Sequence, residues 1–350
     1  MKKKIIGIIC GGRTPEHAVS LLSAQRVFDA IDKKKFSVRV FGVDSNGSWW
    51  CYSRSDHWLK NADDIKKIAL SKKGCKEIVF FPGKRGKYLE INTRKTSSID
   101  IAFPLIHGGE GEDGSLQGFL KLCDITFVGS HVASSAVGMD KEYTKRILQT
   151  WNIPVAPYLV LDRANLFSFE KIKKMLGGIL FLKPARCGSS VGVSKVTNQE
   201  EWTIALKKAI KFDSKVLVEQ EIIGREIECA VLGNENPRAS VLGEIVVKDG
   251  FYSYEAKYVD QNAAELIVPC RLHQKTTKDI QEMAKKAFIA LGCRGMARID
   301  FFLDNQNRIF VNEINTTPGF TSMSMYPKLW GLSGIAYQEL IEKLIVLATK

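Results

Sequence analysis

The order of apolar runs and amphipathic stretches in the first 130 residues constrains the fold more than any other feature of the sequence. An apolar run over residues 2–10 ends at Gly11-Gly12, and an amphipathic stretch over residues 17–32 follows Thr14-Pro15-Glu16, a helix-start signal. Further expected elements are strands at 38–43, 99–106 and 126–129 and a helix at 115–123. This alternation predicts a Rossmann-like α/β domain with an open, mostly parallel sheet.

The start of the chain and its cysteines indicate the compartment. The basic start Met1–Lys4 and the apolar run after it resemble a short secretion signal. The run meets Gly11-Gly12-Arg13 without a cleavage region, however, which favours a buried first strand. The eight cysteines form no Cys-x-x-Cys pair, as expected for reduced thiols of a cytosolic enzyme rather than a zinc site or disulfide framework. No apolar run reaches the roughly 18–20 residues of a membrane helix, so we expect a cytoplasmic protein without a membrane partner.

The net charge of +13 leaves two interpretations open. A basic face could bind nucleic acid or another anionic surface, whereas dispersed lysines would simply be solvated. The basic clusters lie far apart along the chain and have no interleaved aromatic residues: Lys33–Lys35, Lys84-Arg85, Lys171–Lys174 and Lys207-Lys208. This favours solvated faces and no nucleic-acid partner, although the charge still suits a small anionic ligand.

After residue 130 the pattern changes. Expected helices cover 141–150, 275–291 and 334–348, and expected strands cover 178–184, 216–221, 226–232 and 243–247. A chain of 350 residues is too long for one small core, so we expect three units, 1–130, 131–215 and 216–350. The lysine-rich stretch 60–95 has weak patterning and is interpreted as a peripheral insertion.

A lysine followed by a glycine–serine loop is the first segment with chemical meaning. The expected strand 178–184 delivers Lys183, and residues 187–192 read Cys-Gly-Ser-Ser-Val-Gly. Backbone N–H groups of such a loop can close over phosphates while the lysine supplies positive charge. Because the spacing matches neither a Walker loop nor Gly-x-Gly-x-x-Gly, an ordinary turn with a surface lysine remains an equal alternative.

Two apolar stretches interrupted by polar residues form the second segment. Residues 298–303 and 310–315 read as strands joined by a hairpin turn at 304–307, so antiparallel pairing could place Asp300 opposite Glu313 or Asn315. Two carboxylates and an amide oxygen form an all-oxygen set that suits Mg²⁺. The third segment follows at once, because the turn at Pro318-Gly319 exposes backbone N–H groups that suit an oxyanion or a carboxylate.

These segments and four others resemble the D-alanine–D-alanine ligases of the ATP-grasp superfamily, in family order along essentially the whole chain. The four others are Cys10–Leu21 with Glu16-His17 and Val19-Ser20-Leu21, His107–Gly118, Gly138–Lys141 and Tyr254–Tyr258. The resemblance implies an ATP-grasp fold, in which a Rossmann-like domain precedes two α+β subdomains that sandwich ATP. It also implies a homodimer that makes D-alanyl-D-alanine for peptidoglycan precursors through a D-alanyl phosphate, mostly by positioning and charge neutralisation.

The resemblance also implies roles for individual residues. ATP would contact Lys141, Lys183, Ser190, Glu219, Glu226 and Lys257, and two Mg²⁺ or Mn²⁺ ions would bind Asp300, Glu313 and Asn315. Glu16, Ser189 and Tyr258 would form a hydrogen-bonded group that holds the first D-alanine and ties the closing loops together. Arg298 and the Gly319 N–H would stabilise the oxyanion, Ser324 and the Met325 N–H would hold the second carboxylate, and His107 would lie near the first substrate.

Two positions bear on specificity and on departures from the family. A tyrosine at position 258 is typical of D-alanine as second substrate, whereas phenylalanine is typical of D-lactate, and D-serine remains a further alternative. The strand that would line the adenine slot reads Glu219-Gln220-Glu221, where relatives often have Glu-Lys, so contacts there could be weaker. The alternatives from other classes are a non-catalytic nucleotide-binding protein and a nucleic-acid-binding module with steep salt dependence.

Overall fold

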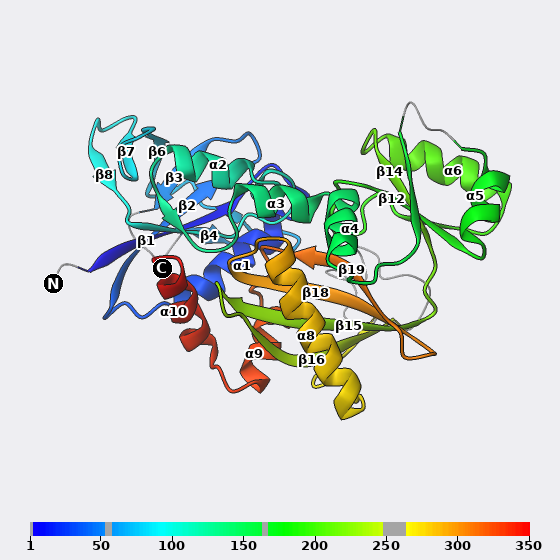
Figure 1. The fold of residues 1–350 in the computed structure, drawn as a ribbon. Coiled ribbons are helices and arrows are strands. Elements are labelled where there is room, and N and C mark those ends of the chain that lie inside the picture. The colour runs from blue at the N-terminus through cyan, green and yellow to red at the C-terminus, as the bar shows by residue number, and fades with distance from the viewer. Residues whose placement is uncertain (1–2, 53–57, 163–166, 248–263) are drawn as a thin grey trace.

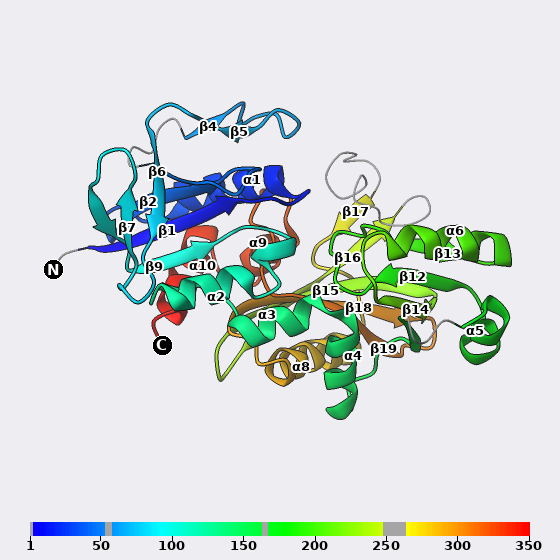
Figure 2. The same ribbon diagram turned by 90° about the horizontal axis from the view of Figure 1, so that it is seen from above.

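The computed structural model describes residues 3–52, 58–162, 167–247 and 264–350. Within these ranges the chain builds three larger sheets of eight, four and five strands and a two-stranded ribbon. Figures 1 and 2 show the eight-stranded sheet at one end of the molecule and the four-stranded sheet at the other, with the five-stranded sheet between them. The predicted α/β architecture is therefore present.

The eight-stranded sheet has a parallel centre and an antiparallel extension. Its strand order is β10-β9-β1-β2-β3-β6-β7-β8, and β10, β9, β1 and β2 run parallel. β1 is almost wholly buried, which agrees with a first strand rather than a signal segment. The strands are β1 Lys4–Gly11, β2 Phe36–Val43, β3 Trp49–Tyr52, β6 Cys75–Phe80, β7 Lys87–Glu90, β8 Thr96–Ser98, β9 Ile101–Pro104 and β10 Thr126–Phe127.

The expectation of a mostly parallel sheet is wrong for its second half. Strands β3, β6, β7 and β8 pair antiparallel, and three of these strands come from or border the lysine-rich stretch 60–95. Ile78 and Phe80 of β6 are buried while Val79 between them is exposed, so this part of the stretch extends the edge of the sheet with one buried face. The ribbon of β4 Leu59–Lys60 and β5 Ala69–Leu70 lies beside it.

Helices from both ends of the chain meet in a core between the eight-stranded and the five-stranded sheets. One core cluster joins Ile6 and Ile8 of β1 to Tyr326 and Leu340 of the last two helices. Phe103 of β9 also meets Phe320 edge to face, with 5.8 Å between ring centroids. The N-terminal and C-terminal parts therefore share one core. These helices are α1 His17–Ala30, α9 Met325–Leu332 and α10 Tyr337–Leu347, whereas α2 Ser115–Leu122 belongs to the core on the other face of the eight-stranded sheet.

The four-stranded sheet forms a small subdomain with its own core. Its order is β11-β14-β12-β13, all antiparallel, and its apolar cluster runs from Leu161 to Val218. Helices α5 and α6 belong to the same subdomain and stand apart from the rest of the chain in Figure 1. The elements are β11 Tyr158–Leu161, α5 Phe169–Leu176, β12 Leu180–Pro184, β13 Ser194–Val196, α6 Gln199–Ile210 and β14 Val216–Gln220.

The five-stranded sheet carries the predicted hairpin. Its order is β17-β16-β15-β18-β19, all antiparallel. Leu148, Ile153 and Val155 join its core cluster, so the apolar face of helix α4 packs on this sheet. The elements are α3 Val132–Met139, α4 Lys141–Thr150, β15 Gly224–Gly233, β16 Arg238–Val247, β17 Ala264–Ile267, α8 Gln274–Ala290, β18 Gly295–Asp304 and β19 Ile309–Asn315.

Two further observations concern the whole described chain. None of its helices has the length and apolarity needed to span a bilayer. All eight cysteines are free thiols, and burial raises the pKa of the Cys10 thiol well above its usual range.

Candidate active site

The glycine–serine loop has a constrained backbone. It leaves strand β12 after Lys183 and Pro184, and Ser189 and Ser190 both have positive φ values, 49° and 59°. Two adjacent non-glycine residues in the left-handed region are uncommon and costly, and such strain gathers at ligand-binding loops. The loop is therefore held in one conformation by its surroundings.

Glu16 provides part of that hold. Ser189 Oγ donates a 2.6 Å hydrogen bond to Glu16 Oε1, joining residues 173 positions apart. Glu16 stands just before α1, but its side chain makes no cap hydrogen bond to that helix. It is only 9% exposed, and a Cβ atom on Gly108 would lie 2.4 Å from its Oε2, so Gly108 allows the carboxylate its close approach. The alternative of a mere helix-start acid therefore does not describe Glu16.

Lys141 supports the same loop from helix α4. Its Nζ donates to the Cys187 carbonyl at 2.7 Å, and its backbone N–H donates to the Ala185 carbonyl at 3.0 Å. These bonds place the ammonium group beside the start of the loop. Two predicted phosphate contacts, Lys141 and the loop, thus lie together.

A buried charge cluster lies under the second lysine. Lys183 Nζ donates to Glu219 Oε2 at 2.6 Å, and Lys145 Nζ lies 3.1 Å from Glu219 Oε1. Burial would raise the pKa of Glu219, but the two ammonium groups outweigh it and lower that pKa to about 2. Lys183 Nζ also lies 3.4 Å from Asn312 Oδ1, so it bridges the small subdomain and β19.

Sequence reasoning did not single out Lys145. It lies one turn after Lys141 on α4, and its side chain is 1% exposed. A lysine four residues from a predicted phosphate ligand shares its helix face, which is the signal that could have found it.

The predicted metal ligands meet across the β18–β19 hairpin. The register pairs Asp300 with Glu313 and Arg298 with Asn315, which decides between the two arrangements that the sequence allowed. The register shifts just after Asp300, and such bulges often re-aim side chains beside active sites.

Arg298 holds this cluster together. Its Nε and Nη2 donate to Asp300 Oδ1 and Oδ2, both at 2.7 Å, and its Nε lies 3.2 Å from Glu228 Oε2. Burial opposes the charge, but Asp300, Glu228 and Glu313 raise the pKa of Arg298 well above its usual value. Glu228, on neighbouring β15, was not predicted, because only the register of β15 against β18 brings it opposite Asp300.

The donor set fits a hard divalent cation. The described residues contain no group of three His, Cys, Asp or Glu side chains suited to a metal, and the set here has two carboxylates and one amide. Asp300 Oδ2 accepts from Arg298 and Asn315, whereas Oδ1 accepts one hydrogen bond within the described ranges and so retains a lone pair. Mg²⁺ commonly takes one or two carboxylates and fills its remaining positions with water and phosphate oxygens.

The segment after β19 carries three predicted residues, Gly319, Ser324 and Met325. Ser324 Oγ accepts from the Thr321 N–H at 3.0 Å and lies immediately before α9, whose first residue is the buried Met325. A Cβ atom on Gly319 would lie 2.7 Å from Ser324 Oγ, so a side chain at this position would displace the hydroxyl. The N-terminus of α9 suits a carboxylate.

His107 lies deep between the N-terminal and C-terminal parts. Its Nε2 is 2.9 Å from Ser23 Oγ and its Nδ1 is 3.2 Å from the Thr317 carbonyl. Because both ring nitrogens face protein atoms, the histidine joins α1 to the segment that carries Gly319.

The other predicted residues are spread around these clusters. Glu226 lies on β15 opposite Phe302, half-buried. Gln220 ends β14, where relatives often have lysine, and Lys195 from β13 reaches the adjacent Glu221 with a 2.7 Å ion pair. A different lysine therefore supplies positive charge beside this strand. Lys257 and Tyr258 lie outside the described residues.

Comparisons with known proteins agree with this geometry. Two family models match, "D-ala D-ala ligase N-terminus" over residues 5–130 and "D-ala D-ala ligase C-terminus" over residues 147–346. Among relatives, D-alanine--D-alanine ligase of Oceanobacillus iheyensis is 50% identical, covering 99% of this chain and 95% of its own length. D-alanine--D-alanine ligase A of Escherichia coli is 48% identical, with coverages of 99% and 96%.

Solved structures extend the likeness to the fold. The D-alanine-D-alanine ligase from Coxiella burnetii superposes with a TM-score of 0.88 at 36% identity, covering 99% of this chain and 94% of its own. The VanG D-Ala:D-Ser ligase from Enterococcus faecalis superposes with a TM-score of 0.87 at 34% identity. The match covers 99% of this chain and 100% of that chain. Sequence and fold therefore agree that the chain belongs to the D-alanine–D-alanine ligase family, with the ATP-grasp fold.

Proposed function

We propose that this protein is an ATP-dependent ligase that joins two D-alanine molecules into D-alanyl-D-alanine for peptidoglycan precursors. The observation that carries the proposal is the Glu16–Ser189 hydrogen bond, which ties the N-terminal domain to the loop beside Lys141. A substrate amine held at Glu16 would thus lie next to a nucleotide phosphate held at the loop. Family membership supports the same reaction.

In the first step, a carboxylate oxygen of the first D-alanine attacks the γ-phosphorus of ATP, and ADP leaves. Lys141, Lys183, Lys257 and Ser190 are proposed to hold the phosphates, and Glu219 and Glu226 the rest of the nucleotide. With its pKa at about 2, Glu219 is an anion at neutral pH, so Lys145 and Lys183 stay charged beside it. The residues' main contribution is orientation and charge neutralisation.

Asp300, Glu313 and Asn315 are proposed to hold two Mg²⁺ or Mn²⁺ ions. When bound, the ions would neutralise phosphate charge, which is worth several kcal/mol in Lewis-acid catalysis. Arg298 already neutralises part of the charge of Asp300 and Glu228, which lowers the repulsion among these acids.

In the second step, the amine of the second D-alanine attacks the carbonyl carbon of the D-alanyl phosphate, and phosphate leaves. Ser324 and the Met325 N–H are proposed to hold the second carboxylate at the start of α9. Arg298 and the Gly319 N–H are proposed to stabilise the oxyanion, where losing one donor typically costs about 10²–10³ in rate. Glu16, Ser189 and Tyr258 are proposed to accept, as one hydrogen-bonded group, the proton that leaves the amine. His107 is proposed to lie near the first substrate.

The identity of the second substrate is the finer part of the proposal. The likeness to a D-Ala:D-Ser ligase makes D-serine the competing candidate. Tyr258 supports D-alanine over D-lactate by resemblance alone.

Phosphate release from ATP and Mg²⁺ tests the proposal. D-alanine, D-serine, D-lactate, L-alanine and no acceptor are compared, with Glu313→Ala as the matched variant. Release that depends on D-alanine and collapses in Glu313→Ala is the expected result. Faster release with D-serine or D-lactate would identify that compound as the second substrate. Release without an acceptor would indicate ATP hydrolysis, and no release under any condition would leave a non-catalytic nucleotide-binding protein.

We further propose a homodimer that works in the cytoplasm. The eight free thiols suit a reducing compartment, and the dimer rests on the family resemblance. Light scattering after gel filtration tests the dimer, and a mass of one chain would exclude it.

A further inference from the structure

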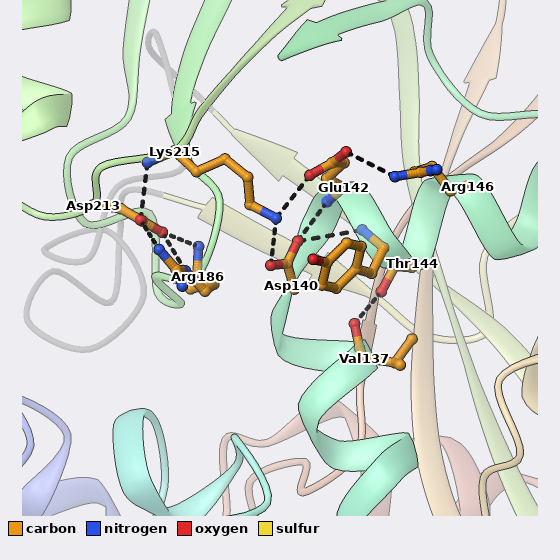
Figure 3. A network of polar contacts seen from close by, with 9 residues as sticks. Val137, Asp140, Glu142, Thr144, Arg146, Arg186, Asp213 and Lys215 are labelled. Atoms are coloured by element: carbon orange, nitrogen blue, oxygen red, sulfur yellow. Dashed lines mark hydrogen bonds and ion pairs between the residues drawn. The ribbon is translucent and has the colours of Figure 1, made fainter. Parts of the chain in front are cut away.

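Lys215 lies outside every role assigned above, yet its side chain is more firmly enclosed than most lysines. Its Nζ donates to Asp140 Oδ2 at 2.6 Å and to Glu142 Oε2 at 2.7 Å, as Figure 3 shows. The same ammonium lies 4.1 Å from the ring centroid of Tyr143. With 15% of its side chain exposed, Lys215 occupies a cage of two carboxylates and one aromatic ring.

The two sides of this cage belong to different bodies. Lys215 directly precedes β14, whose Val216 and Val218 belong to the core of the small subdomain. Asp140 and Glu142 stand at the start of α4, whose Leu148 belongs to the core of the five-stranded sheet. The ion pairs therefore fasten the small subdomain to the main body at one point.

Both segments that these ion pairs join lie close to residues assigned to the nucleotide. Asp140 uses its Oδ1 to cap α4, accepting from the N–H groups of Glu142 and Tyr143 at 3.1 and 3.2 Å. The residue after it is Lys141. On the other side, Asp213 accepts the N–H and Nε of Arg186 at 2.9 and 3.0 Å, just before the loop. Figure 3 shows the two groups as neighbours, joined by the backbone of Lys215.

We propose that Lys215 is a positioning residue: it sets the angle between the small subdomain and α4, and thereby the distance between Lys141 and the phosphate-binding loop. The proposal rests on the proposed nucleotide site. Within the described ranges, the Lys215 side chain contacts Asp140, Glu142 and Tyr143, and none of these three is assigned to ATP. A misplacement of about 1 Å by a remote change can cost up to 10²-fold.

The test compares Lys215→Met, Lys215→Arg and Lys207→Met with the parent protein. Lys207 lies exposed on α6 of the same subdomain, so its variant loses the same charge without the cage. Phosphate release is measured against ATP concentration at saturating D-alanine, and ADP–Mg²⁺ affinity is measured by calorimetry. Thermal unfolding reports on the fold.

Lys215→Met is expected to raise the KM for ATP and the Kd for ADP about 10-fold while kcat falls less than about 3-fold. Lys215→Arg, which can reach both carboxylates, should recover most of the loss, and Lys207→Met should match the parent. A merely structural role would lower the active fraction, hence kcat, with KM and Kd unchanged, and that result would overturn the proposal. Because the Kd needs no turnover, failure of the ligase activity in the parent would be distinguishable from failure of this inference.

Discussion

The hydrogen bond between Ser189 and Glu16 gives the sharpest prediction. The two oxygens lie 2.6 Å apart, and Glu16 is 9% exposed, so water competes weakly for the bond. A hydrogen bond to a charged group is worth about 1.5–3 kcal/mol. Removing it should therefore lower kcat/KM for D-alanine by roughly 10- to 150-fold.

A double-mutant cycle isolates that bond. Parent, Ser189→Ala, Glu16→Ala and the double variant are compared by phosphate release at saturating ATP, because a glutamine at position 16 would still accept the Ser189 hydroxyl. If this hydrogen bond accounts for the loss of kcat/KM, Ser189→Ala should lower kcat/KM only slightly in a protein whose Glu16 is already replaced. The coupling energy between the two positions should then be about 1.5–3 kcal/mol. Alanine keeps the Cβ atom, so the strain at the positive φ of Ser189 is matched in every protein of the cycle.

Ser190→Ala is the matched control, because it changes the same residue type in the same backbone region. Ser190→Ala should weaken ATP use without coupling to Glu16→Ala. Coupling below about 0.5 kcal/mol between Ser189 and Glu16 would refute the view that this bond aligns the two domains, because independent sites already vary by that amount.

Three further predictions follow from the site. Above pH 4.5, the lowered pKa of Glu219 contributes about 3 kcal/mol of stability, which is lost as the pH falls toward about 2. The difference in unfolding free energy between the parent and Glu219→Gln, measured with urea, should therefore become smaller below pH 4.5. A difference that stays constant with pH would contradict this prediction. Glu313→Gln should raise the Mg²⁺ concentration for half-maximal rate at least about 10-fold; an unchanged Mg²⁺ titration would remove Glu313 from the metal site. Gly108→Ala places a Cβ 2.4 Å from Glu16 Oε2 at a φ of +67°, so it should lower kcat/KM for D-alanine and cost about 1–2 kcal/mol of stability. If Gly108→Ala and the parent had the same kcat/KM for D-alanine, displacement of the Glu16 carboxylate would have no effect on the reaction.

The local parts of the site were predictable from sequence. A hairpin is set by its turn and its apolar pattern, so the facing positions of Asp300 and Glu313 follow from neighbouring residues. The loop after Lys183 and the helix that begins at Lys141 were likewise expected where they lie. Family resemblance, and not periodicity, joined these pieces into one site.

The partners of these residues were not predictable, because they depend on contacts between distant segments. Glu228 matters only through the β15–β18 register, and Lys215 only through α4, about 73–75 residues away. The sheet extension was missed for another reason. Its strands bury one face, and lysines on the other face weaken the apolar pattern, as with exposed Lys87 beside buried Tyr88.

The shared core of the two ends of the chain affects how the protein folds during synthesis. Ile6 and Ile8 of β1 pack in the cluster that contains Leu340 and Leu344 of α10. The ribosome makes β1 and α1 long before α9 and α10, so the part of this core that the last two helices complete stays open during most of translation. The small subdomain, whose core spans Leu161 to Val218, can instead close as soon as those residues emerge. During synthesis, the core of the small subdomain can therefore form completely before the core around β1.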